Sequence, residues 1–368
     1  MKKKILIVHS GGEWMRGSEY QVLEMACALR LQGRQVSVAC DQSVMADAAQ
    51  RLGIDAYLFD PGEIMIDGPT LRLEFFRVAK ANWTVLRIAN RLKADLIYAN
   101  TGRATQLSYF AARIGRIPIV SHIHCNYNLR YLWLYRTTRV DCTIYCSQST
   151  MRFNEKKLAS RRAEVVVNGI DFERMAPRPV NRASRERYGI KDSTIVLGQL
   201  AAVVSEKGVE ILLRAVAQLR QEGMDIVVMF AGNGEIDRFR AVANELGSGE
   251  YAYFIGQVSD PAEWFSSIID INVLASTNEP FGRTVVEAAA CGVYSVATNV
   301  GGLNEAMLGG QLGELFDLNN VQSLVDKLMV VVQAGKWKKK SLSLRSLARE
   351  KFDIQGRATQ FINIVDSL

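Results

Sequence analysis

Short apolar runs and longer amphipathic segments alternate along the chain. The first apolar run, Lys4–His9, leads into a glycine-containing turn and then into Glu19–Leu31, where apolar residues recur at helical spacing. Further strands of this first series are predicted at Gln35–Cys40, Asp95–Ala99, Ile117–Ser121 and Cys142–Tyr145. Strands that alternate with helices are typical of parallel sheets covered by helices on both faces.

A second series of the same kind follows a polar stretch at residues 175–187. Its predicted strands are Thr194–Leu200, Ile226–Ala231, Ala252–Ile255 and Ile269–Leu274. We therefore predict an α/β protein with two Rossmann-like, doubly wound parallel-sheet domains that face a central cleft. The domains are expected at residues 1–173 and 174–353, with a last helix over residues 354–368 that packs back on the first domain.

The composition is that of an ordinary folded protein. Of the 368 residues, 48% are hydrophobic and 23% are charged, which excludes a disordered chain, a collagen-like repeat and a coiled coil. No apolar run approaches the ~18 residues that a membrane span needs. The basic start of the chain, followed by Ile5–Val8, imitates a signal peptide, but the run is too short and is interpreted as a first buried strand. We therefore expect a cytoplasmic protein, with a peripheral position at the cytoplasmic face of the membrane left open.

The cysteines do not indicate a metal site. The chain has six of them without paired CxxC spacing, and histidines at ligand spacing are missing. Cys142 and Cys146 share one face of a predicted strand, which fits packing in a core better than zinc binding. We therefore expect no bound metal.

Positive charge is concentrated in the first half. Residues 1–180 hold 26 Lys and Arg against 16 Asp and Glu, a net +10, whereas the remainder holds 19 against 22, a net −3. The arginines expected on the cleft side of the first sheet are Arg103, Arg130, Arg136 and Arg139. A basic half indicates an anionic partner. A membrane surface or a phosphorylated acceptor fits better than nucleic acid, because no compact basic and aromatic stripe accompanies the charge. A solvated surface with a chance bias is the alternative interpretation.

The segment Ser276–Ala288 carries the most informative chemistry. It follows a predicted strand, and ligands of open parallel sheets bind beyond the carboxyl ends of the strands. Pro280 and Gly282 interrupt the loop before a predicted helix, whose first amides and dipole can bind phosphate. Glu287, just over one turn into the helix, is placed for ribose hydroxyls, and Glu279 for a sugar beyond the phosphates. The alternative interpretation makes Glu279 a helix cap and Glu287 a surface charge.

Glycine turns end several other strands of the second series. Gly232 ends one strand, Gly256 and Gln257 end the next, and Gly301–Glu305 follows a third. Lys207 precedes a helix, where its ammonium can act as a point charge on a phosphate. Each feature is a weak signal alone, but together their order and spacing support a ligand site in this half of the chain.

This layout resembles the GT-B glycosyltransferases of family 4, the glycosyl transferases group 1, which are retaining enzymes that use nucleotide sugars. The resemblance covers nearly all of the chain and is strongest over Gly198–Glu305, where two glutamates stand eight residues apart around Pro280-Phe281-Gly282. In the first domain, Gly17-Ser18-Glu19 resembles the family's glycine-rich loop after the first strand. Asn168–Asp171 resembles the segment that leads into the hinge.

The resemblance implies which residues bind the donor and which are catalytic. The implied donor-binding residues are Gly17, Ser18, Lys207, Gly232, Gly256, Gln257, Pro280, Phe281, Gly282, Arg283, Thr284 and Glu287. The implied catalytic residues are Glu279 and His124. The strand that ends at His124 resembles the one carrying the family's active-site histidine, which lies near the donor sugar and supports the developing positive charge. His122 and His9 are expected to be structural.

The resemblance also implies a hexosyltransferase-type reaction. A sugar moves from a nucleoside diphosphate sugar, UDP or GDP, to an acceptor hydroxyl with retained configuration. The acceptor is expected to be a glycan, a lipid-linked molecule or another glycoconjugate of bacterial polysaccharide or glycolipid synthesis. No metal ion or cofactor is expected to be required, since no Asp-x-Asp signature ends a strand. Lys207 and the amides of Gly282–Thr284 would stabilise the leaving diphosphate, which would accept the proton of the acceptor.

Two positions depart from the family pattern. Many relatives carry an Arg before the Lys-Gly pair, where this chain offers Gln199 or Ala202, so one phosphate cation is missing unless Arg283 compensates. Tyr294 stands where the family usually has Pro. A catalytically degenerate GT-B protein that binds nucleotide sugar or a partner without turnover is therefore the alternative function, and a GT-B epimerase is a more distant one.

Overall fold

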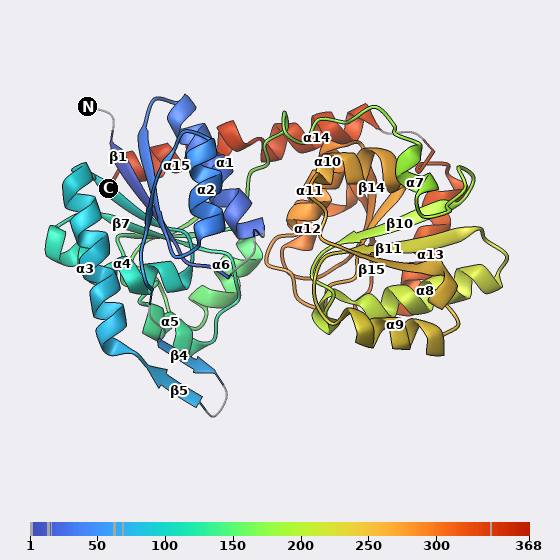
Figure 1. Cartoon of the computed structure of the whole chain (residues 1–368), viewed down its shortest axis with the longest axis horizontal. Coiled ribbons are helices and arrows are strands. Elements are labelled where there is room, and N and C mark those ends of the chain that lie inside the picture. Colours follow the sequence, from blue (N-terminus) through green and yellow to red (C-terminus); the bar gives the residue numbers. More distant parts are fainter. Residues whose placement is uncertain (1–2, 13–14, 16, 62–63, 68–69, 339–340) are drawn as a thin grey trace. The chain divides into compact units, whose positions relative to one another are not determined.

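The chain folds into two compact units (Figure 1). The structure is a computed structural model that describes residues 3–12, 15, 17–61, 64–67, 70–338 and 341–368. The first unit comprises Met1–Gly169 together with Ile354–Leu368, and the second comprises Ile170–Asp353. Each unit holds a parallel sheet with helices around it, so the predicted pair of Rossmann-like α/β domains is confirmed.

The first unit is built on a seven-stranded parallel sheet. Its strands are β1 (Lys4–His9), β2 (Gln35–Cys40), β3 (Asp55–Leu58), β6 (Leu96–Ala99), β7 (Ile119–Ile123), β8 (Cys142–Tyr145) and β9 (Ala163–Val165). They are arranged in the order β3-β2-β1-β6-β7-β8-β9. β4 (Ile64–Asp67) and β5 (Thr70–Leu73) form a separate antiparallel pair. β7 begins two residues later than predicted, after Pro118, whose nitrogen cannot donate to a strand ladder.

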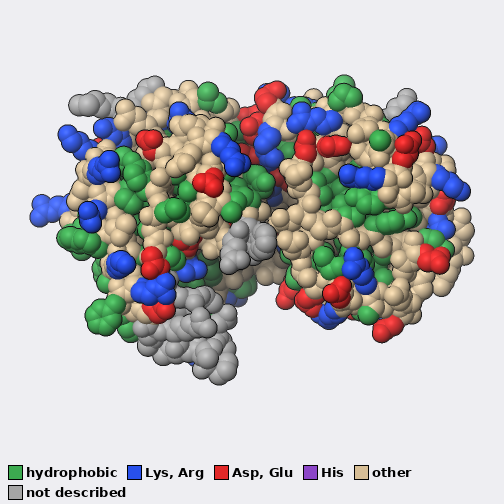
Figure 2. Space-filling view, viewed as in Figure 1, with side chains coloured by type: hydrophobic (Ala, Val, Ile, Leu, Met, Phe, Trp, Pro, Cys, Tyr) green, Lys and Arg blue, Asp and Glu red, His purple; other side chains and the backbone are tan. Residues whose placement is uncertain are grey.

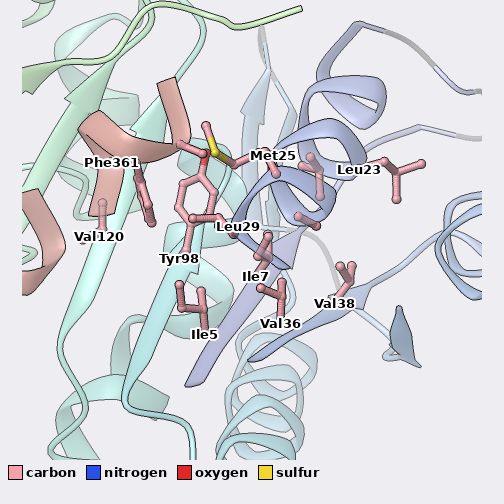
Figure 3. Close-up of a cluster of buried hydrophobic side chains, with 14 of the residues drawn as sticks. Ile5, Ile7, Leu23, Met25, Leu29, Val36, Val38, Tyr98, Val120 and Phe361 are labelled. Carbon is pink, nitrogen blue, oxygen red and sulfur yellow. The ribbon is translucent and has the colours of Figure 1, made fainter. Parts of the chain in front are cut away.

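Helices cover both faces of this sheet. On one face lie α1 (Gly17–Leu31), α2 (Ser43–Arg51) and α15 (Ile354–Asp366). On the other face lie α3 (Phe75–Leu92), α4 (Gly102–Gly115) and α5 (Leu129–Tyr135). A further helix, α6 (Gln148–Glu155), follows β8. Figure 3 shows how α15 packs into the hydrophobic core between the first sheet and α1. Phe361 points toward Tyr98 of β6, beside Leu29 of α1. The Phe361 and Tyr98 ring centroids are 4.7 Å apart.

The second unit repeats the arrangement with six parallel strands. They are β10 (Ile195–Leu200), β11 (Ile226–Ala231), β12 (Ala252–Gly256), β13 (Ile271–Leu274), β14 (Tyr294–Thr298) and β15 (Gly313–Phe316). The order β12-β11-β10-β13-β14-β15 is that of a doubly wound nucleotide-binding fold. The helices are α7 (Ala183–Glu186), α8 (Val209–Gln221), α9 (Ile236–Glu245), α10 (Pro261–Glu263), α11 (Arg283–Ala290), α12 (Leu303–Ala306), α13 (Val321–Gln333) and α14 (Leu342–Phe352).

The strand order of each unit fixes where a ligand can bind. In both sheets the chain starts in the middle, runs to one edge, and returns to the other side of the first strand. The direction of winding therefore reverses between β1 and β6 in the first unit and between β10 and β13 in the second. Loops diverge beyond the carboxyl ends of these strand pairs and leave room for a ligand.

Candidate active site

Two charged side chains meet beyond the carboxyl ends of β10 and β13. The Lys207 ammonium donates to Oε2 of Glu279 at 2.6 Å, and the Ser276 hydroxyl donates to the same oxygen at 3.3 Å. The side chains of Lys207 and Glu279 are 25% and 15% exposed, so solvent reaches both. The structure therefore brings together the lysine predicted for phosphate and the glutamate predicted for the sugar.

Glycines let the backbones around this pair approach closely. A Cβ atom at Gly208 would lie 2.0 Å from the carbonyl oxygen of Ala275, and Gly208 also has a φ of +68°. On the other side, the Gly302 amide donates to the carbonyl of Glu279 at 2.8 Å. A Cβ atom at Gly302 would lie 2.1 Å from the carbonyl oxygen of Pro280. Glycine is thus required at positions 208 and 302 for this packing.

The loop continues into α11, which begins at Arg283 after Gly282, whose φ is +96°. Glu287 is only 6% exposed, and its Oε1 accepts a hydrogen bond from Nε of Arg283 at 2.8 Å. Arg174 lies 3.8 Å from the same oxygen. Glu287 is therefore no surface charge, and because α11 has no side-chain cap, Glu279 is no helix cap. Both alternative interpretations of these glutamates are wrong.

Phe281 was predicted among the donor-binding residues, but its side chain belongs to the core. It is 2% exposed and its ring packs edge-on against Phe352 of α14, with centroids 5.7 Å apart. Only the backbone of Phe281 is therefore left for a ligand. The sequence could not show this packing, because Phe352 lies far along the chain.

The glycine turns of β11 and β12 lie beside the end of β10. The Gly232 amide donates to the carbonyl of Gly256 at 2.8 Å, and a Cβ atom at Gly232 would lie 1.9 Å from the carbonyl oxygen of Ala201. Gly256 and Gln257 are at the end of β12, the edge strand, two strands away from β10. Gln257 is exposed and lines a separate hollow that also contains Tyr188.

Gln199 occupies the region where many family members carry an arginine. It is buried, and its side-chain amide donates to the backbone carbonyl of Lys207. Gln199 therefore supplies no charge but holds the turn that carries the lysine. Arg283 is engaged with Glu287, as described above. Tyr294, which replaces the usual proline, accepts a hydrogen bond from the Lys336 ammonium at 2.8 Å through its hydroxyl.

A second polar cluster lies beyond the carboxyl ends of β1, β6 and β7 in the first unit. Asn100, directly after β6, is its centre. Its Oδ1 accepts from the Tyr98 hydroxyl at 2.9 Å and lies 3.0 Å from Nε2 of His124. Its Nδ2 lies 3.4 Å from Nδ1 of His9, whose Nε2 is 3.2 Å from Oε1 of Glu19. Asn100 therefore links His124 to His9.

These contacts define one consistent set of proton positions. Asn100 presents an oxygen to His124 and an amide to His9, so we assign the proton of His124 to Nε2. His9 then accepts at Nδ1 and donates from Nε2 to the Glu19 carboxylate. Burial raises the pKa of Glu19, but the hydrogen bonds from His9 and from the Ser18 hydroxyl outweigh this effect, and the pKa falls from 4.5 to about 2. Glu19 is thus ionised at neutral pH.

His122 is a buried, neutral neighbour of His124. Its Nδ1 lies 2.7 Å from the Tyr98 hydroxyl, and its ring centroid is 4.1 Å from that of His124. Burial and the nearby His124 hold the pKa of His122 well below its usual value. A neutral His122 places no positive charge beside His124.

The remaining predicted residues of the first unit lie at the start of α1. Gly17 is exposed at the first position of the helix, and the Ser18 hydroxyl donates to Oε2 of Glu19 at 2.8 Å. Our sequence reasoning missed the roles of Asn100 and Glu19. A signal was available for Asn100, because it is the first polar residue after a predicted strand at the winding reversal.

Two of the four arginines expected on the cleft side lie elsewhere. Arg136 follows α5, and its guanidinium stacks over the ring of Phe110 at 5.0 Å. The carbonyl of Arg139 accepts from Arg113 near the end of α4. Because this segment leads into the start of β8, it lies at the amino edge of the sheet, and the prediction is wrong for these two. Arg103 is in the first turn of α4 and lines a hollow at the carboxyl edge.

Neither a metal cluster nor a membrane span is found in the described part of the chain. No group of three His, Cys, Asp or Glu side chains there could hold a metal ion. Among the described helices, none is long and apolar enough to cross a bilayer.

Two Rossmann-like units with polar groups beyond the carboxyl edges of their sheets define a GT-B architecture. Residues 180–350 match the family model for glycosyl transferases group 1, and residues 15–174 match the model for glycosyltransferase family 4. The chain belongs to the GT-B glycosyltransferases of family 4.

Similar proteins cover the chain to different extents. The phosphatidyl-myo-inositol mannosyltransferase of Mycobacterium leprae is 23% identical over 365 residues, which cover 96% of this chain and 93% of that one. The D-inositol 3-phosphate glycosyltransferase of Corynebacterium jeikeium is 35% identical over 178 residues; the match covers 45% of this chain and only 42% of that relative's length. Anabaena HepE, solved with UDP and glucose, superposes with a TM-score of 0.85 at 22% identity over the whole of both chains, which shows the shared fold.

Proposed function

We propose that this protein transfers a sugar from UDP- or GDP-sugar to a hydroxyl of a glycan or lipid-linked acceptor with retained configuration. The observation that carries the proposal is the Lys207–Glu279 pair beyond β10 and β13, beside the start of α11. It combines a cation for phosphate, a carboxylate for sugar hydroxyls and a helix N-terminus within one unit. We assign the donor to residues 174–353, and the acceptor to residues 1–173 with the last helix.

Each donor-site residue has a distinct role in this proposal. Lys207 and the amides of Gly282–Thr284 bind the diphosphate and stabilise its charge as it leaves. Glu287, held by Arg283, accepts hydrogen bonds from the ribose. Glu279 accepts from hydroxyls of the transferred sugar. The turn at Gly232 borders the nucleotide.

The chemistry at the sugar follows from the charges that develop. As the bond to the diphosphate breaks, the sugar carbon becomes positive and the phosphate oxygen negative. His124, oriented through Asn100, supports the sugar as that charge develops. The acceptor hydroxyl attacks the face that the phosphate leaves and gives its proton to the leaving phosphate oxygen, which retains the configuration. This scheme requires neither a metal ion nor a cofactor.

Lipid-linked acceptors are supported by the relatives. The Mycobacterium leprae protein is named for transfer of mannose to a phosphatidyl-inositol, and this first unit is basic, as an anionic acceptor demands. We therefore also propose that the protein is cytoplasmic and makes peripheral contact with an anionic membrane. Its role would be in bacterial glycolipid or polysaccharide synthesis. Nucleic acid is not a proposed partner.

A ligand screen by thermal shift and calorimetry tests the donor assignment. The full chain is titrated with UDP, GDP, ADP and TDP, with and without magnesium. A ligand that binds only the folded state raises its melting temperature by mass action. We expect one nucleotide to do so equally with and without the metal, and transfer from the corresponding sugar nucleotide to follow. Binding without transfer to any acceptor would favour the degenerate GT-B protein, and no binding at all would refute the donor site.

A further inference from the structure

An apolar groove of about 420 Å³ lies on the face of the first unit that α3, α4 and α5 form. We call it the aromatic groove. Five of its lining residues are Phe75, Trp83, Phe110, Ile114 and Trp133. Each of the five is between 47% and 66% exposed. Large apolar side chains gathered in one exposed patch mark an interaction surface.

The aromatic groove lies in a strongly basic part of the chain. Residues 75–140 contain eleven Lys and Arg and a single carboxylate, Asp95. Hydrophobic and basic side chains lie next to one another over α3 in Figure 2. Among the residues that the structure describes, no carboxylate is within ion-pair distance of Lys80, Arg87 or Arg136. Arg77 of α3 and Arg113 of α4, in contrast, do have such partners. The positive charge of this face is therefore available to a partner.

The charges directly border the apolar surface. On α3, one face of the helix carries Phe76, Lys80, Trp83 and Arg87, at spacings of four, three and four residues. Phe76 is 93% exposed. The guanidinium of Arg136 lies over the ring of Phe110 on α4.

We propose that the aromatic groove and its basic border dock the first unit on the surface of an anionic lipid bilayer. Tryptophan rings favour the level of the lipid headgroups, while bordering Lys and Arg side chains meet anionic headgroups. A second copy of this chain would bring the same excess of positive charge against itself, and this repulsion disfavours a dimer through the groove.

Membrane docking is useful to this protein if its acceptor is lipid-linked, so the inference rests on that part of the proposed function. α4 begins at Gly102, two residues after Asn100, and its later residues Phe110 and Ile114 line the groove. Docking by this face would hold the first unit, which carries His124, at the membrane surface. An acceptor with a lipid anchor then reaches the protein by diffusion within the bilayer.

Cosedimentation of the full chain with vesicles tests the docking. Vesicles of phosphatidylcholine alone are compared with vesicles that also contain phosphatidylglycerol, at about 0.05 M and about 0.5 M salt. We expect the protein to bind the anionic vesicles, with affinity at least about tenfold lower at the higher salt because the Debye length shrinks. Lipids with brominated tails are expected to quench the fluorescence of Trp83 and Trp133.

Two variants and one matched control locate the surface. Trp83→Ser combined with Trp133→Ser is expected to lower vesicle affinity at least about tenfold by removing apolar contact, without a loss of salt dependence. Lys80→Glu combined with Arg87→Glu is expected to lower it about tenfold and to weaken the salt dependence. Leu31→Ser is the control: Leu31 is 78% exposed on α1, which covers the opposite face of the sheet, and binding should not change.

Three outcomes would overturn the docking. They are binding that ignores lipid charge and salt, tryptophan variants that bind like Leu31→Ser, and a dimer that these variants abolish in a chain that does not bind vesicles. Calorimetry with the nucleotide is run on the same proteins. Nucleotide binding without vesicle binding refutes the docking alone, whereas vesicle binding without any nucleotide binding refutes the proposed function alone.

Discussion

Replacing Glu19 with glutamine tests the polar cluster of the first unit through its stability. Glu19 is 1% exposed, and the contacts with His9 and Ser18 favour its charged form. Glutamine has the shape of a protonated glutamate, so Glu19→Gln imitates the chain with this carboxyl neutral. The free-energy difference between the parent and the variant therefore reports what ionisation of Glu19 contributes to folding.

The magnitude follows from the lowered pKa. One pKa unit corresponds to about 1.4 kcal/mol. The drop from 4.5 to about 2 therefore stabilises the folded unit by about 3 kcal/mol when Glu19 is ionised. Because the folded pKa is the lower one, the contribution is complete above pH 4.5 and is lost as the pH falls from 4.5 through about 2.

Hydrogen exchange of the β1 amides, followed in increasing urea, measures the free energy of unfolding of the first unit by itself. At about pH 7 we expect the free energy of unfolding of Glu19→Gln to be about 3 kcal/mol lower than that of the parent. Near pH 3 this difference should shrink to about half. Asp47→Asn is the matched control, because Asp47 is an exposed carboxylate of α2 in the same unit. A deficit that is equal at both pH values, or no larger than that of the control, would refute the argument.

Further predictions concern transfer itself. Glu279→Ala and His124→Ala are expected to lower kcat by about 100-fold or more with unchanged thermal unfolding. Glu279 positions the sugar through its hydroxyls, and His124 supports the charge that develops on it. Glu287→Ala should weaken nucleotide binding about tenfold in calorimetry and change kcat less; parent-rate transfer by both glutamate variants would place the donor elsewhere. Gln199→Leu keeps the side-chain volume but frees the turn of Lys207, so KM for the donor should rise about fivefold, and an unchanged KM would contradict this role.

The sequence predicted the architecture because parallel strands buried on both faces are read directly as apolar runs. Ile5 to Val8 and Ile226 to Ala231 are such runs, and each is a strand in the structure. The loops that carry chemistry could be predicted for the same reason, since in a parallel sheet every loop after a strand lies at one edge. This rule placed Lys207 and Glu279 in such loops, and the two side chains meet in the structure.

Partners that are distant in sequence could not be predicted. Lys207 and Glu279 are 72 residues apart, and nothing in either segment shows that they pair. The burial of Phe281 depends on Phe352 of α14, whose position is set by tertiary packing. Arg136 was misplaced because composition gives charge without direction, whereas the path of the chain from helix to strand carries this residue to the amino edge.

The two units hold their charged groups in different ways, and this difference supports the division of roles. Glu19 and His9 are buried among fixed hydrogen-bond partners, so they orient Asn100 and through it a single imidazole. The Lys207–Glu279 pair is partly exposed, so water can solvate both groups when they separate. A diphosphate can therefore take the ammonium at small cost and leave the carboxylate of Glu279 to a sugar hydroxyl. Exchange of partners is what a donor site needs, and fixed orientation is what a catalytic imidazole needs.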